Sequence, residues 1–238
     1  MRAQWGVHVQ EGDVQVSDAT LESLKAFDTG TLANAIDRLK LRAPTVGYSS
    51  TEIRCLFPEL GTVVGYAVTC REDTTTPRGA MHTSFEAVYR AIADDGRPVI
   101  VVCEDMSNER VRSCHLGDMM STLMHGIGAV AFVTDGGVRD LEGIRQNAPG
   151  FQVFAAGTVP GAGESHVVDV GQNVWVGGLE VAAGDLLVTD TNGVLSMPIE
   201  HIDDILAEAD RVREREAGLV EFMHGPDFSL DGYLSRRR

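Results

Sequence analysis

The sequence predicts an α/β fold in a single compact domain spanning residues 1–238. Short apolar runs that are typical of strands alternate with helical periodicity across residues 98–156. Glycine-punctuated strand pairs follow over 174–198, and an amphipathic helical stripe closes the chain over 199–222. No internal repeat and no linker divides the chain, so one domain is the simplest organisation.

The N-terminal region predicts two helices over residues 17–40. Apolar side chains recur there at intervals of three and four, with a break near Thr29 and Gly30. The valine-rich stretch 62–70 predicts a strand, 71–79 predicts a polar loop, and 83–93 returns to helical spacing.

The central region predicts a strand–helix–strand–helix–strand unit. Its expected strands are 98–103, 129–134 and 152–156, and its expected helices are 118–125 and 140–146. The strands are continuous apolar runs, which is typical of parallel strands covered on both faces and joined by right-handed crossovers.

Two hairpins and a helix are expected after this unit. The hairpins cover 174–181 and 186–197, and Asn192-Gly193 in the second is a strong signal for a type I′ turn. The helix that begins at Ile199 has a polar face and an apolar face, so it could also pack on a neighbouring subunit.

The charge balance argues against nucleic acid and membranes as direct partners. The chain carries 35 acidic and 20 basic residues, a net charge of −15, and its one dense basic run, Arg236 to Arg238, is expected to be a solvated tail. The first 18 residues lack the apolar region of a secretion signal, and no stretch is long and apolar enough to cross a bilayer. Four cysteines without CxxC spacing predict free thiols, and a cytoplasmic location is expected.

The stretch from Gly117 to Asp140 carries the chemical signal. In an α/β unit, the first turn of a helix and the end of the following strand lie at the same edge of the sheet, which brings Gly117 and Asp118 near Arg139 and Asp140. That edge is where such sheets bind ligands, and free N–H groups at a helix start attract anions. Met119 and Met120 would supply those N–H groups.

The side chains in this stretch fit a metal-assisted site for a carboxylate. Arg139 offers a planar donor pair suited to a carboxylate or an enolate oxygen. Asp118 and Asp140 offer hard oxygen ligands that suit Mg²⁺ or Mn²⁺. The same residue types also allow a purely structural explanation, in which both aspartates cap helices and Arg139 pairs with them.

The ordered motifs resemble a known family. Asp118 follows a glycine and is separated by twenty residues from Arg139-Asp140, which follow Asp-Gly-Gly-Val; this pattern resembles the family of 4-hydroxy-4-methyl-2-oxoglutarate aldolases and regulator of ribonuclease activity A. The likeness continues through residues 28–37, 61–69, 176–181, 184–185 and 190–198. Ala183 and Asn34 depart from the family pattern, and the stretch 71–81 is unusual.

The resemblance implies a fold, an activity and a set of roles. The fold would be a β/β/α swivelling-type domain assembled as trimers or hexamers, with active sites between subunits. The activity would be that of a class II pyruvate aldolase, a lyase that also decarboxylates oxaloacetate and uses Mg²⁺ or Mn²⁺. Asp140 would contact the metal, Asp118 would hold it through water, and Arg139 would bind the pyruvyl oxygen. The substrate carboxylate would bind the backbone around Gly117, Met119 and Met120.

The chemistry of this reaction suits the remaining residues. The chain has two lysines, Lys25 and Lys40, both in the predicted N-terminal helices, so a Schiff-base aldolase is disfavoured. A polarised water near Asp118 is expected to take the proton of the substrate's C4 hydroxyl, with help from Glu214 or Glu216 of a neighbouring subunit.

Two further expectations remain open. Among the histidines, His115 is the one expected near the pocket. The alternative function is a non-catalytic regulator that binds a ribonuclease through a protein surface, because the resembling family contains such members.

Overall fold

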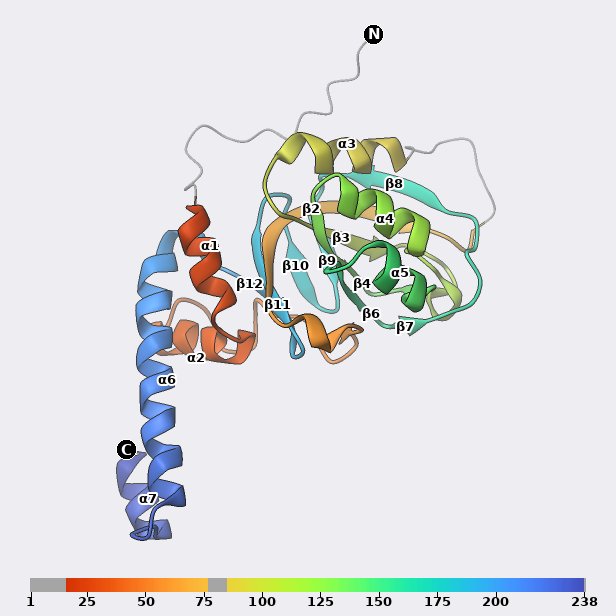
Figure 1. Ribbon diagram of the computed structural model, residues 1–238. Coiled ribbons are helices and arrows are strands. Elements are labelled where there is room, and N and C mark those ends of the chain that lie inside the picture. The colour runs from red at the N-terminus through yellow and green to blue at the C-terminus, as the bar shows by residue number, and fades with distance from the viewer. Residues whose placement is uncertain (1–15, 77–84, 238) are drawn as a thin grey trace.

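The computed structural model describes residues 16–76 and 85–237 (Figure 1). The helices are α1 (Asp18–Lys25), α2 (Thr29–Leu39), α3 (Phe85–Asp95), α4 (Asp118–Gly126), α5 (Leu141–Asn147), α6 (Ile202–His224) and α7 (Leu230–Arg236). The strands are β1 (Arg54–Cys55), β2 (Val63–Asp73), β3 (Val99–Asp105), β4 (Ala129–Thr134), β5 (Gly137–Val138), β6 (Gln152–Ala155), β7 (Gly157–Thr158), β8 (His166–Val170), β9 (Val174–Val176), β10 (Leu179–Val181), β11 (Leu186–Asp190) and β12 (Gly193–Ser196).

One mixed sheet organises the molecule. Its strand order is β1-β6-β4-β3-β2-β11-β12, and β8 pairs with the far end of β2. The central pairs β2–β3, β3–β4 and β4–β6 are parallel, whereas β1, β8, β11 and β12 pair antiparallel. The parallel centre is therefore the predicted strand–helix unit, and its carboxyl edge is where a ligand site is expected.

The two faces of the parallel strands are covered by different layers. Val99, Val101 and Cys103 of β3 face a core beneath α3, α4 and α5. Ile100 and Val102 face the opposite core beneath the β9–β10 hairpin. Because both faces are buried, the strands are apolar throughout rather than alternating. Figure 1 shows α4 and α5 side by side over the sheet.

Two N-terminal helices are present, but the break between them lies at residues 26–28 rather than near Thr29 and Gly30, which begin α2. Ser17 and Asp28 cap α1 and α2, each side chain accepting the backbone N–H of the third helical residue. With α6 they cover the antiparallel strands β11 and β12, across the molecule from α4 and α5 (Figure 1). The two helix groups therefore belong to separate cores.

The structure corrects two local predictions in this part of the chain. The strand β2 continues through Asp73, where a loop was expected to begin at Arg71, because β3 and β8 both pair with this extension. The second hairpin turns at Thr191 and Asn192, between paired Asp190 and Gly193, and neither turn residue has the positive φ of a type I′ turn. Residues 83 and 84 of the third predicted helix, like the rest of 77–84, lie outside the described residues.

The C-terminal part also differs from the prediction. The helix α6 runs to His224, past the expected end at 222, and α7 follows instead of a solvated tail. Arg236 is the last residue of α7, and its guanidinium lies 4.2 Å from the centre of the Phe222 ring. A basic side chain that was expected to be free is thus part of a packed helix pair.

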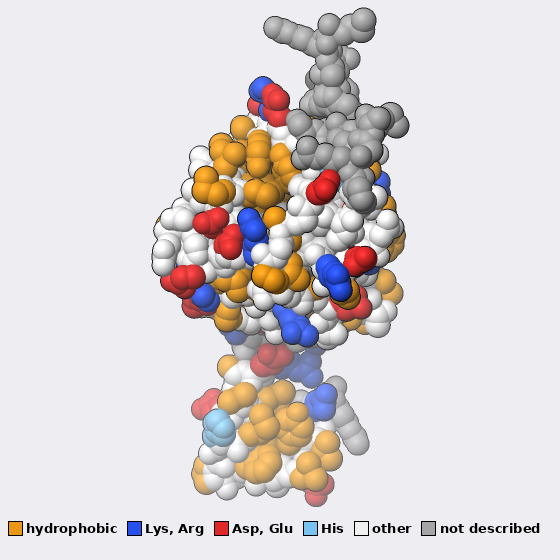
Figure 2. Space-filling model, turned by 90° about the vertical axis from the view of Figure 1, so that its right-hand side faces the viewer, with side chains coloured by type: hydrophobic (Ala, Val, Ile, Leu, Met, Phe, Trp, Pro, Cys, Tyr) orange, Lys and Arg blue, Asp and Glu red, His pale blue; other side chains and the backbone are white. Residues whose placement is uncertain are grey.

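The far end of α6 and α7 forms an extension that projects from the body (Figure 1). Figure 2, which views the right-hand side of Figure 1, shows charged and apolar side chains interspersed on the body and an apolar area on the extension below. The exposed large apolar residues of the extension are Val220, Met223, Phe228, Leu230 and Leu234. Across the described residues, none of the helices combines the length and the apolar character that crossing a bilayer requires.

Candidate active site

A pocket of about 160 Å³ opens at the carboxyl edge of the parallel strands. The first turn of α4 and the segment that leads into β8 both line it. The structure brings five of the six predicted site residues to this pocket, with Asp140 directly beside them. The lining residues are Glu72, Cys114, Leu116, Gly117, Asp118, Met119, Met120, Arg139, Ala162, Gly163 and Ser165.

Backbone hydrogen bonds join the two halves of the predicted motif. The His115 N–H donates to the Gly137 carbonyl at 2.9 Å, and the Arg139 N–H donates to the Leu116 carbonyl at 2.9 Å. These bonds pair the segment before α4 with the segment after β4. The twenty-residue separation in sequence is therefore closed by strand-like pairing, as the sheet-edge geometry required.

Arg139 and Asp140 form an ion pair at the pocket rim. Arg139 Nε lies 3.1 Å from Asp140 Oδ2, and the two side chains are 39% and 41% exposed, so both are open to a ligand. Asp140 has a left-handed backbone, with φ 59° and ψ 37°, which is uncommon for a residue with a side chain and concentrates at functional sites.

Gly117 lets the two halves approach closely. A Cβ atom at this position would lie 3.1 Å from Asp140 Oδ2 and 3.3 Å from Arg139 Nε. A side chain there would press on the Arg139–Asp140 pair. The glycine before Asp118 is thus explained by close packing rather than by its backbone angles, since its φ is −135°.

The purely structural explanation, in which Asp118 and Asp140 cap helices and pair with Arg139, is only partly met. Gly117, not Asp118, is the N-cap of α4, and Asp118 is its first residue. Asp140 occupies the N-cap position of α5, yet its carboxylate makes no capping hydrogen bond and pairs with Arg139 instead. The ion pair was foreseen in that explanation, whereas the two capping roles are absent at these positions.

One expected substrate donor is already engaged. The Met119 N–H donates to Asp118 Oδ1 at 2.8 Å, so the carboxylate of Asp118 competes for the group that was predicted to bind an anion. The second oxygen of Asp118 faces α5, because a Cβ at Gly143 would lie 2.9 Å from it. Asp118 is therefore oriented between the starts of two adjacent helices.

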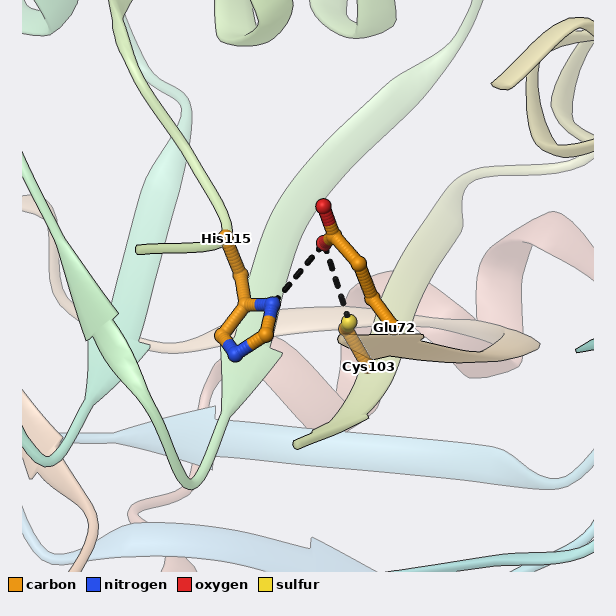
Figure 3. A group of neighbouring side chains, drawn as sticks. All are labelled: Glu72, Cys103 and His115. Carbon is orange, nitrogen blue, oxygen red and sulfur yellow. Dashed lines mark hydrogen bonds and ion pairs between the residues drawn. The ribbon is translucent and has the colours of Figure 1, made fainter. Parts of the chain in front are cut away.

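Sequence reasoning missed Glu72 and Ser165. Glu72 was placed in a loop, yet it lies on β2, 1% exposed, with its carboxylate at the pocket. Its Oε1 accepts a hydrogen bond from the Ser165 hydroxyl. Its Oε2 accepts from His115 Nδ1 at 2.9 Å and from the Cys103 thiol at 3.7 Å (Figure 3). A charged residue inside a longer apolar strand was the available signal.

His115 is held between two buried carboxylates. Its Nδ1 faces Glu72, and its Nε2 lies 3.1 Å from Asp105 Oδ1. Burial alone would lower the pKa of His115, but the hydrogen bonds and charges of Asp105 and Glu72 raise it to about 9. Burial works against the Asp105 carboxylate, yet His115, Ser113 and Ser107 lower the pKa of Asp105 to about 2.

Glu72, Cys103 and His115 also have the spacing of a metal site. One potential ligand atom from each lies within 4.8 Å of the others. Such a nitrogen, sulfur and oxygen set would suit zinc rather than Mg²⁺. Binding would require His115 and the Cys103 thiol to lose protons, although their surroundings raise the pKa of both. The cluster fits an internally compensated charge network better than a site for a hard divalent ion.

Comparison with known proteins decides the family. The family model RraA-like, described as Aldolase/RraA, matches residues 14–196, well over half of the chain. This chain belongs to the RraA-like family. The fold and the family predicted from the sequence motifs are thereby confirmed. The match ends at 196, so α6 and α7 lie beyond it.

Individual relatives of this RraA-like chain point to more than one function. A protein of Halalkalibacterium halodurans named "Putative 4-hydroxy-4-methyl-2-oxoglutarate aldolase" is 29% identical over 55% of this chain and 62% of its own length. The chain thus spans about three fifths of the length of that relative. An uncharacterized protein from Pseudomonas syringae pv. tomato has the same fold, with a TM-score of 0.70, 20% identity and coverage of 98% and 99% of the two chains.

A third relative carries a regulatory name. A member of the RNase ES inhibitor RraA protein family from Streptomyces coelicolor has a TM-score of 0.65 at 20% identity, covering 85% of this chain and 96% of its own. At such identities the structural likeness concerns the fold. The function of this RraA-like chain therefore rests on its own pocket.

Proposed function

We propose that this protein is a divalent-metal-dependent carbon–carbon lyase of the class II pyruvate aldolase type. Its substrates would be short 2-oxo acids with a second carboxylate, such as 4-hydroxy-4-methyl-2-oxoglutarate, which cleaves to two molecules of pyruvate. Oxaloacetate decarboxylation would be a second activity through the same enolate. The observation that carries the proposal is the meeting of Asp118, Arg139 and Asp140 at one exposed pocket edge.

The acidic pair fits Mg²⁺ or Mn²⁺ by its chemistry. Asp118 and Asp140 offer hard carboxylate oxygens at the starts of two adjacent helices, and the Asp140 side chain is 41% exposed. Asp140 would hold the ion directly and Asp118 would hold it through water. When bound, such an ion withdraws electron density from the substrate's keto oxygen and stabilises the developing enolate.

The remaining pocket groups would orient the substrate. Arg139 places a guanidinium at the rim, where it would bind the pyruvyl oxygen and oppose the negative charge that develops there. The first turn of α4, at Met119 and Met120, would face the substrate carboxylate. Because the Met119 N–H is bonded to Asp118, Met120 is the stronger backbone donor in this proposal.

A lysine-based mechanism has no support from the positions of the two lysines within one subunit. Lys25 lies in α1 and Lys40 ends α2, and both helices pack across the molecule from α4 and α5 (Figure 1). A Schiff base requires a lysine amine at the reacting carbonyl. The charge on the enolate would instead be met by Arg139 and the cation.

The decisive experiment measures pyruvate release by the full-length protein. With Mg²⁺ or Mn²⁺, the wild-type protein should release pyruvate from 4-hydroxy-4-methyl-2-oxoglutarate and from oxaloacetate, and EDTA should stop it until the metal is restored. Arg139→Ala should lower kcat by about 10²- to 10³-fold, the typical loss for one transition-state donor.

The matched control is Arg90→Ala. Arg90 is an exposed arginine that pairs with Glu86 within α3, so this variant should keep wild-type turnover. Normal turnover by Arg139→Ala would remove that residue from the mechanism. No pyruvate from either substrate would overturn the lyase proposal and favour the regulator alternative.

We further propose a homo-oligomer, with a trimer or a hexamer as the expected form. Glu214 and Glu216 lie on α6, across the molecule from the pocket, and Glu216 accepts a hydrogen bond from Asn34 at 3.4 Å. An acidic contribution from either residue would therefore come from a neighbouring subunit. Light scattering of the purified protein tests the assembly.

A further inference from the structure

A line of hydrogen-bonded groups leads from the pocket into the core. It begins at the Ser165 hydroxyl and continues through the Glu72 carboxylate to His115, whose Nε2 forms an ion pair with Asp105 Oδ1 at 3.1 Å. Ser165 and Glu72 both line the pocket, whereas His115 and Asp105 are 1% and 5% exposed. The line thus joins a half-buried hydroxyl to a sealed charge cluster.

The two pocket residues come from a different part of the fold than the proposed metal residues. Ser165 directly precedes β8, and Glu72 lies on β2, which pairs with β8. Asp118 and Arg139 come from α4 and from the segment before α5. A substrate held at Arg139 would therefore share one pocket of about 160 Å³ with Ser165.

We propose that Ser165 and Glu72 form the proton relay of this pocket, with Glu72 as the base and His115 as its positioning residue. This inference rests on the proposed lyase function and deepens it. It differs from the sequence-based expectation, which gave the proton transfer to a water near Asp118.

The relay balances the reaction. The C4 hydroxyl of the substrate gives its proton to Ser165 Oγ while the Ser165 proton moves to Glu72 Oε1. The C3–C4 bond then breaks, and C4 becomes the carbonyl carbon of one pyruvate. The electron pair of that bond stays with C3 and forms the enolate of the second pyruvate. The proton returns from Glu72 through Ser165 to C3, which completes the second pyruvate and restores both side chains.

The buried cluster provides a counter-charge for the Glu72 carboxylate at the pocket. The Glu72 carboxylate is compensated by the imidazolium of His115, which Asp105 holds on its other side. Burial opposes the charged form of His115, but the two neighbouring carboxylates raise the pKa of His115 to about 9, so a positive charge lies beside Glu72 Oε2 before cleavage. A general base must reach its proton by hydrogen-bond geometry, directly or through one bridging group, and Ser165 provides that bridge.

The test compares two reactions in the same variants. Retro-aldol cleavage must remove a proton from a hydroxyl, whereas the bond-breaking step of oxaloacetate decarboxylation removes none. Ser165→Ala deletes the bridging hydroxyl of a half-buried residue, and Glu72→Gln keeps the side-chain shape but cannot accept the proton. We expect each variant to lower the retro-aldol kcat by about 10²-fold, with KM changed less than about threefold. The loss in decarboxylation should be at least about tenfold smaller.

A third readout follows the return of the proton. Wild-type protein in D₂O should exchange the methyl protons of pyruvate, measured by NMR, and both variants should lose this exchange in parallel with cleavage. Ser165→Thr keeps a hydroxyl and should recover a substantial part of both rates. Ser50→Ala, which alters an exposed loop serine outside the pocket, should match the wild-type protein.

The outcomes separate the relay from the proposed function. If the wild-type protein releases pyruvate and Ser165→Ala cleaves the aldol substrate at the same rate, the relay is overturned and the lyase function stands. Equal losses of cleavage and decarboxylation in Ser165→Ala also overturn it, because they would indicate a structural role. If the wild-type protein releases no pyruvate at all, the proposed function fails and the relay fails with it.

Discussion

Two charged clusters meet at one pocket and are built on opposite principles. At the rim, Arg139 and Asp140 pair while about two fifths of each side chain remains exposed. In the core next to the pocket, His115 lies between Glu72 and Asp105, and all three residues are at most 5% exposed. The first cluster can exchange its partners for a ligand, whereas the second already pairs its charges within the protein.

The difference shows that burial decides whether a charged residue can change its partners. Exposed ion pairs contribute little to stability, so the rim can change its contacts at low energetic cost. Removing one member of a buried pair leaves an uncompensated charge, so the inner cluster is fixed in place. A site that binds a charged ligand and moves a proton needs both kinds of cluster.

The largest expected difference between the buried cluster and the rim pair is in the free energy of unfolding. Glu72→Ala should lower the free energy of unfolding by about 3 to 5 kcal/mol, because His115 would lose a partner in a buried setting. Urea unfolding followed by circular dichroism measures the change. Asp140→Ala at the rim is the matched comparison and should cost no more than about 1 kcal/mol. Equal losses in the two variants would break the contrast.

The next effect is the dependence of stability on pH. The folded pKa of His115 is about 9, above its ordinary value of 6.5, so its stabilisation is complete below pH 6.5 and is lost as the pH rises toward 9. The shift corresponds to up to about 3 kcal/mol. Asp105 acts in the other direction: its pKa of about 2 means that its contribution is lost as the pH falls from about 4 toward 2.

Chemical unfolding at a series of pH values tests this sign. The midpoint should fall between pH 6.5 and 9, and the fall should be smaller in Glu72→Gln, where His115 has lost one carboxylate. NMR titration of the His115 imidazole gives the same information at one site. An imidazole that titrates near 6.5 in the wild-type protein would contradict the compensated cluster.

The smallest effect probes the rim itself. In Gly117→Ala the added Cβ would press on Asp140 and Arg139 at 3.1 and 3.3 Å, and the exposed ends of these side chains would shift by a few tenths of an ångström. We expect kcat/KM to fall about tenfold, because small displacements of positioning groups are costly. Stability should hardly change, because φ at Gly117 is allowed for alanine. Gly157→Ala, where nothing lies within 4 Å of the added atom, is the control.

Much of the fold could be predicted from residue patterns. The strand Ala129–Thr134 was predicted at its observed bounds, and the start of α4 at Asp118 was predicted as well. The juxtaposition of Gly117 and Asp118 with Arg139 and Asp140 also followed, because parallel strands and their helices share one sheet edge. The roles of these residues stay predictions that the proposed experiments address.

The missed features share a cause. The continuation of β2 to Asp73 depends on pairing with β8, which comes about a hundred residues later, so local polarity at Arg71 and Glu72 indicated a loop. Likewise, Arg236 was expected in a solvated tail but packs on Phe222 of α6. Contacts between distant segments override local propensity at such positions.

Residue patterns alone predict the layered α/β architecture and the edge at which charged groups gather, because periodicity and chain direction are local properties of the polypeptide. The placement of Glu72 at the pocket and of His115 between two acids became visible in the folded molecule. Both placements depend on strand pairing and desolvation between segments that are far apart in the chain. Neither effect produces a periodic pattern in the sequence.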